Sequence, residues 1–149
     1  MEIAEKRVAM EALLHFIEAE RLLRTKVPQV RDDLPELWAA QIEGVRAERG
    51  DPRWGPTKKL TLGALIPMLA PHRGTNQALN FLPYYPDEYD KAVAFRNAIG
   101  HGDWDELIVL GGAAQALRWG QSFYQLVRTC ENVIHSAVLQ LKGGWVWPE

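Results

Sequence analysis

The stretch PDEYDKAVAFRNAIGHGD, residues 86–103, decides the fold of this chain and holds its most informative side chains. A proline followed by acidic residues is typical of a helix start, and closely spaced glycines are typical of a helix end. Between these signals, Tyr89 and Val93 are four residues apart and give an apolar stripe at helical spacing. We therefore predict a helix from about Pro86 to Ile99.

Three polar side chains of distinct acid–base character lie at the end of this predicted helix: Arg96, Asn97 and His101. Asn97 and His101 are four residues apart, so their side chains are neighbours on a helix. At roughly 100° per residue, Arg96 lies about 140° around the helix from His101. One helix therefore brings the guanidinium and the imidazole together poorly, whereas two copies of the chain that face each other would bring them together well.

The chain on the N-terminal side of this stretch is predicted to form further helices. The first runs from about Ile3 to Arg24, and a second from about Leu34 to Arg49. A short helix from Leu62 to Leu69 follows an N-cap at Thr61 and is kinked or kept brief by Pro67. The predicted buried face of the first helix consists of apolar residues at i, i+3, i+4 and i+7, which are Met10, Leu13, Leu14 and Ile17.

The C-terminal third of the chain is also predicted to be helical. The apolar run 107–110 would suit a strand by residue type, but no second convincing strand exists to pair with it. We therefore predict that the segment from Trp104 continues into the last helix, with Gly111-Gly112 near its start and its end at about Lys142. The aromatic tail after that helix is expected to pack on the body of the protein or on a partner.

The composition predicts one soluble globular domain, residues 1–149. The predicted helices together give an all-α bundle of four to five helices. A net charge of −2 excludes charge-driven binding of nucleic acid over the whole surface but leaves room for a local basic cleft. The single cysteine, Cys130, excludes an internal disulfide and a thiolate zinc site. With no signal peptide or membrane span in the pattern, we expect a cytoplasmic protein without a metal or cofactor.

The pair Arg96-Asn97, followed after three residues by His101-Gly102 on an all-helical chain of this length, resembles the signature of the HEPN superfamily. The resemblance implies a helical bundle that forms a homodimer. It also implies metal-independent endoribonuclease activity of a prokaryotic toxin or defence type, at a cleft between the two subunits. By the same resemblance, the catalytic residues would be Arg96, Asn97 and His101.

These residue types fit RNA cleavage without a metal. The reaction needs a base for the 2′-hydroxyl proton, an acid for the leaving oxygen and positive charge at the phosphate. His101 can act as base or acid because histidine titrates near neutral pH. Arg96 can bind two phosphate oxygens with paired hydrogen bonds, and Asn97 can orient the imidazole or contact the phosphate.

Three further residues are candidate substrate contacts. Trp104 can stack on a base, and Arg73, in a predicted turn, can contact a phosphate. Asp103 lies beside the predicted phosphate cleft, where its negative charge would weaken RNA binding. In HEPN toxins that are paired with a nucleotidyltransferase antitoxin, a tyrosine occupies the position of Asp103 and is the modification target. An antitoxin or regulatory protein partner stays open, but adenylylation at this position is not expected.

Two other interpretations of the motif stay open. A histidine in the last turn interacts favourably with the helix dipole and caps carbonyl groups, so Arg96 and His101 can be simple helix-end residues. Alternatively, the same cleft belongs to a non-catalytic helical module that binds a nucleotide or a protein partner. The low net charge and Asp103 favour that second interpretation.

Overall fold

The structure is a computed structural model that describes residues 1–27, 36, 39–40, 61–70, 82, 85–130 and 145–149. Within these residues the chain forms helices and no strand, which confirms the all-α class. The predicted helix from Leu34 to Arg49 lies outside the described residues apart from Glu36, Ala39 and Ala40. None of the described helices combines the length and the apolar character needed to cross a membrane. The five helical elements are α1 (Ile3–Arg24), α4 (Leu62–Leu69), α5 (Pro86–Gly100), α6 (Trp104–Leu110) and α7 (Ala113–Cys130).

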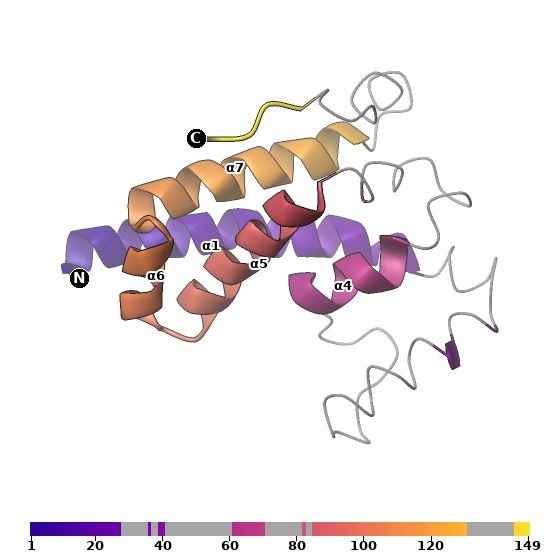
Figure 1. Ribbon diagram of the computed structural model, residues 1–149, viewed down its shortest axis with the longest axis horizontal. Coiled ribbons are helices and arrows are strands. Elements are labelled where there is room, and N and C mark those ends of the chain that lie inside the picture. Colours follow the sequence, from indigo (N-terminus) through magenta and orange to yellow (C-terminus); the bar gives the residue numbers. More distant parts are fainter. Residues whose placement is uncertain (28–35, 37–38, 41–60, 71–81, 83–84, 131–144) are drawn as a thin grey trace.

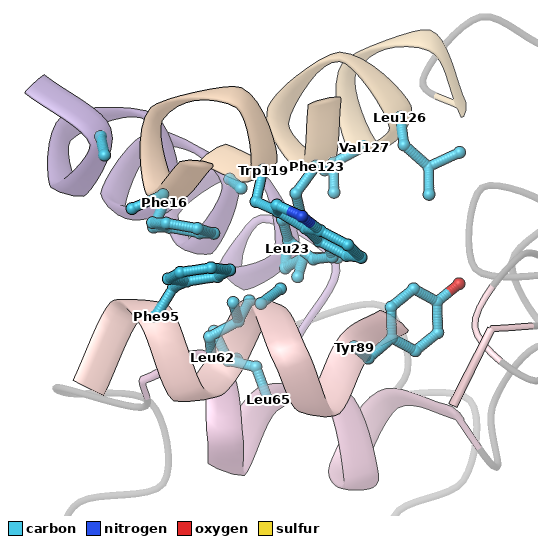
Figure 2. Close-up of a cluster of buried hydrophobic side chains, with 14 of the residues drawn as sticks. Phe16, Leu23, Leu62, Leu65, Tyr89, Phe95, Trp119, Phe123, Leu126 and Val127 are labelled. Carbon is cyan, nitrogen blue, oxygen red and sulfur yellow. The ribbon is translucent and has the colours of Figure 1, made fainter. Parts of the chain in front are cut away.

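Helices α1 and α7 lie lengthwise beside each other and form the longest contact in the structure (Figure 1). Helix α5 crosses this pair, with α6 at one end of α5 and α4 beside it. The core fills the space between these layers. In Figure 2 the rings of Phe16 from α1 and Phe95 from α5 face each other, next to Trp119 from α7. All three residues are buried, so the helix that carries the motif is fixed to the body of the protein by its apolar face.

Helix α1 has the predicted bounds, but its predicted buried face is wrong. Met10, Leu14 and Ile17 are exposed, and Leu13 is half-buried. The predicted face consists of large apolar side chains, whereas three of the six residues that α1 buries are alanines. The residues that α1 buries are Ala9, Ala12, Phe16, Ala19, Glu20 and Leu23.

Gly120 of α7 explains why small residues are sufficient on α1. A Cβ atom on Gly120 would lie 2.9 Å from the backbone oxygen of Ala12, closer than real Cβ contacts. It would also lie 3.3 Å from side-chain atoms of His15 and Phe16. The two helix backbones therefore approach so closely that alanine already fills the space between them.

The segment 104–110 forms a separate helix, α6. The prediction that it is not a strand is confirmed, but the predicted continuity with the last helix is wrong. Gly111 and Gly112 have φ values of +132° and +90°, which no continuous right-handed helix allows. Helix α7 therefore begins afresh at Ala113, and its predicted apolar residues Trp119 and Phe123 are buried.

The C-terminal segment 145–149 packs back on the body, which is one of the two predicted outcomes. The indole N–H of Trp145 donates to Ser122 Oγ at 3.1 Å. The ring of Trp147 stacks on Trp119, with centroids 5.3 Å apart and planes at 19°. The segment thus runs beside α7 (Figure 1), and its aromatic side chains pack on that helix.

Candidate functional site

Helix α5 ends in a Schellman motif that holds the motif histidine at the helix terminus. Gly102, with φ of +67°, donates its N–H to the Ile99 carbonyl at 3.0 Å, and Asp103 donates its N–H to the Ala98 carbonyl at 2.8 Å. His101 immediately precedes Gly102 as the C-cap residue and is exposed. The imidazole is therefore carried by a fixed backbone and is open to solvent.

The left-handed conformation of Gly102 leads to a stability prediction. Gly102→Ala is expected to lower the free energy of unfolding by about 1 kcal/mol, because an L side chain in this conformation costs about 1–2 kcal/mol. A Cβ atom there would meet nothing within 4 Å, so the loss of stability would come from the backbone conformation alone. Gly102→Asn should lose less, since asparagine tolerates positive φ better. Urea denaturation measures both, and equal stability of wild type and Gly102→Ala would contradict the prediction.

Arg96 is held by a buried carboxylate. Its Nε lies 2.6 Å from Glu20 Oε1, and Glu20 is only 1% exposed. The same oxygen accepts the backbone N–H of Leu62 at 3.0 Å, and Oε2 lies 3.3 Å from Nη2 of Arg24. One side chain of α1 thereby binds the first residue of α4 and the motif arginine of α5. Glu20 was not among the predicted site residues.

The role of Glu20 also changes the predicted start of α4. Thr61 is the N-cap residue, as predicted, but its side chain makes no capping hydrogen bond. The acceptor for the first helical N–H comes from Glu20 instead. Since a helix start leaves several N–H groups without partners inside the helix, a carboxylate at this position is stabilising.

Gly100 determines where the guanidinium of Arg96 lies. A Cβ atom on Gly100 would collide with Arg96 Nη1, so the arginine side chain runs along α5 toward its C-terminal end. His101 follows Gly100 directly. The guanidinium and the exposed histidine therefore lie at the same end of the helix, although their sequence positions are far apart around its axis. Among the described residues, no hydrogen bond occupies either Nη atom of Arg96.

Asn97 completes the predicted catalytic set. Its backbone carbonyl accepts the N–H of His101 at 3.0 Å, which fixes the two residues one turn apart. Asn97 is half-buried, and its side-chain amide makes no hydrogen bond within the described part of the chain. The amide therefore retains its hydrogen-bonding groups, one helical turn before the histidine in the chain.

Two of the three predicted substrate contacts, Asp103 and Trp104, lie among the described residues and make contacts within the chain. Asp103 is the N-cap residue of α6, and its Oδ1 accepts the N–H of Glu106 at 3.1 Å. Trp104 is half-buried, with Lys6 Nζ 5.4 Å from its ring centroid, a cation–π distance. Arg73 lies outside the described residues. The structure therefore gives Asp103 a local stabilising role that requires no substrate.

Comparison of the chain with protein-family models, with curated proteins and with solved structures gives no significant match. Any functional assignment therefore depends on the residues at the end of α5 and on the all-helical architecture. Among the described residues, no three histidine, cysteine, aspartate or glutamate side chains are grouped as metal ligands. The side chains of His101, Arg96 and Asn97 supply an imidazole, a guanidinium and a carboxamide at the end of α5.

Proposed function

We propose that the chain is a HEPN-like, metal-independent endoribonuclease of a prokaryotic toxin or defence type, acting as a homodimer that cleaves RNA at the cleft between its subunits. The observation that carries this proposal is the end of α5, where the guanidinium of Arg96 lies against Gly100, the residue before the exposed His101. Both side chains, with Asn97 one turn away, are placed on a helix end that a Schellman motif fixes.

The reaction follows from the properties of these groups. One His101 takes the proton of the RNA 2′-hydroxyl, whose oxygen forms a bond to phosphorus. The bond from phosphorus to the 5′-oxygen breaks, and a protonated His101 of the partner subunit donates a proton to that oxygen. Two copies of one histidine thereby supply a base and an acid, and the cyclic phosphate product requires no other reactant.

Arg96 retains the geometry needed to bind a phosphate. Its Nε is committed to Glu20, which leaves the edge formed by the two Nη atoms for paired hydrogen bonds to phosphate oxygens. Glu20 also lies 3.3 Å from Arg24, so one buried carboxylate is shared by two guanidinium groups. The carboxylate thus orients the Arg96 side chain.

A second candidate function is a non-catalytic helical module that binds a nucleotide or a protein partner, including an antitoxin, at the same surface. Two observations favour it. Arg96 has a structural partner in Glu20, and Asp103 caps α6, so both residues have roles that require no catalysis. This candidate predicts binding at the end of α5 without turnover.

Cleavage of a broad RNA panel in the presence of EDTA tests the proposal. His101→Ala is expected to lower the cleavage rate by at least about a hundredfold, the lower range for loss of a general acid–base group. His15→Ala is the matched control, because His15 of α1 packs beside Tyr124 of α7 and has no proposed part in the reaction. Circular dichroism confirms that each variant is folded.

The outcomes separate the two candidates. Cleavage that His101→Ala abolishes and His15→Ala preserves supports the ribonuclease. No cleavage by the wild-type chain, together with saturable nucleotide or protein binding that His101→Ala weakens, supports the binding module. Equal cleavage by the wild-type chain and both variants would exclude His101 from the chemistry.

A further inference from the structure

Helix α1 carries an apolar stripe on the face that points away from the core. Within the described part of the chain no element covers this stripe. Ile3, Met10 and Ile17 recur every seven residues, and Leu14 lies four residues beyond Met10, which is the spacing of a helix–helix seam. At roughly 100° per residue, the centre of the stripe lies about 140° around the helix from the buried face. The exposed fractions of its members are 70% for Ile3, 49% for Met10, 62% for Leu14 and 37% for Ile17.

We propose that this stripe is the surface through which two copies of the chain associate. The two α1 helices pack antiparallel, about a two-fold axis that passes between residues 12 and 13. This stripe would be the interface of the homodimer in the proposed function. Only the effect of association on catalysis rests on that proposed function. Association through α1 is measurable whether or not the chain cleaves RNA.

The apolar side chains of the stripe are complementary to themselves in this arrangement. The partner's Leu14 falls at the level of residue 11, between Met10 and Leu14. The partner's Met10 falls at the level of residue 15, between Leu14 and Ile17. Side chains from the two helices therefore alternate along the seam, as knobs and holes require. A different protein would need an apolar stripe with the same spacing to pack here, whereas a second copy of this chain already carries one.

The charges beside the stripe favour the same pairing. Arg7 and Glu18 lie on one edge of the stripe, about 20° apart around the helix at roughly 100° per residue. In a two-fold antiparallel pair, like edges face each other, and residue 7 of one copy lies level with residue 18 of the other. Each Arg7 thus faces the partner's Glu18, twice in the dimer, and this Glu18 also pairs with Arg21 of its own helix at 2.9 Å. A parallel pair would place Arg7 level with the partner's Arg7 and lose this complementarity.

The arrangement also places the two candidate sites on one side of the dimer. On the other edge of the stripe, Lys6 lies over Trp104 at the start of α6, and Glu20 lies further round and holds Arg96. The partner's Lys6 falls at the level of residue 19, next to Glu20. The end of α5, which carries both Arg96 and His101, therefore lies on the same side of the seam in the two subunits. Each subunit would then contribute residues to a shared cleft.

Analytical ultracentrifugation of the full chain tests the interface. The wild-type chain is expected to be a dimer, and Leu14→Glu a folded monomer, because a charge at the centre of the seam would face apolar side chains. Val109→Glu is the matched control: Val109 is an apolar residue of α6 with 78% exposure outside the stripe, so this variant should stay dimeric. Circular dichroism shows whether each variant keeps its helices.

A charge exchange tests the direction and register of the helices. Arg7→Glu and Glu18→Arg should each weaken the dimer by about tenfold, since each replaces two attractive contacts with repulsive ones. The double variant, Arg7→Glu with Glu18→Arg, should restore wild-type affinity. Only a pairing that brings residue 7 next to the partner's residue 18 predicts this rescue.

Several results would overturn the proposal. One is a dimer that survives Leu14→Glu, and another is a double variant no tighter than the single ones. A monomeric wild-type chain that Leu14→Glu destabilises would show that the chain itself covers the stripe. RNA cleavage is assayed separately: a wild-type dimer without cleavage supports the interface and removes the proposed activity. Cleavage by a monomeric Leu14→Glu variant removes the shared cleft and keeps the activity.

Discussion

Glu20→Ala is expected to lower the free energy of unfolding by about 3–5 kcal/mol, the cost of removing one member of a buried ion pair. The substitution leaves the guanidinium of Arg96, whose side chain is 16% exposed, without its opposite charge. It also leaves the N–H of Leu62 without its acceptor, a further desolvated group. Equilibrium denaturation in urea, with the midpoint and slope compared with wild type, measures the loss.

Glu18→Ala is the matched control for this prediction. It removes the same residue type from the same helix, where Glu18 forms an exposed pair with Arg21 at 2.9 Å. Exposed pairs contribute about 0–1 kcal/mol, so the control should change stability little. Both variants are compared in the Leu14→Glu background, because Glu18 also lies in the proposed dimer seam. Glu20→Gln should fall between the two, because glutamine can still accept the N–H of Leu62. A loss from Glu20→Ala no larger than that from Glu18→Ala would show that Glu20 does not join α1, α4 and α5.

The ends of the helices were the most predictable part of the fold. Proline and glycine act on the backbone within one or two residues, so the bounds of α5 follow from local sequence. The same signals at Gly111 and Gly112 mark the break between α6 and α7, and the continuous helix was predicted only because their effect was underestimated. The local sequence is thus sufficient to predict a helix end where a single proline or glycine fixes the backbone conformation.

The orientation of α1 around its own axis was not predictable in the same way. The helix has two stripes with helical spacing. One passes through Leu14 and consists of large apolar residues, and the other passes through Ala12 and Phe16 and includes three alanines. Which of them faces the core depends on the surface of α7, where Gly120 lets the backbones approach closely. Gly120 lies about a hundred residues from α1 in the chain, so the periodicity of α1 does not show which stripe is buried.

The candidate site shows the same division between local and distant information. Asn97 and His101 are neighbours because both lie on one helix, and their proximity follows from spacing alone. The pairing of Arg96 with Glu20 joins residues 76 positions apart. A signal for it exists, since Glu20 is the acidic residue on the face of Phe16 and Leu23, and a carboxylate on a buried face needs a cationic partner. That signal becomes visible only once the small-residue face is known to be the buried one.

Gly120→Leu is expected to lower the free energy of unfolding by about 3 kcal/mol, at the upper end of the usual cost of overpacking. The reason is that even a Cβ atom at this position would lie 2.9 Å from the Ala12 carbonyl, and a backbone atom cannot move aside as a side chain can. Gly120→Ala should cost less, because alanine gains about 1 kcal/mol in helix propensity that partly offsets the clash. Urea denaturation of both variants gives the two values.

Gln121→Leu is the matched control, since it adds the same side chain at the next, exposed position of α7 and should change stability by about 0.5 kcal/mol or less. If Gly120→Ala instead stabilised the protein by the full propensity gain, the two helices would have room that the structure does not show.

The same variants connect stability to the site. A displacement of α1 by Gly120→Leu moves Glu20 away from Arg96 and shifts the exposed stripe, so RNA cleavage and dimer affinity should fall together, whereas Gln121→Leu leaves both unchanged.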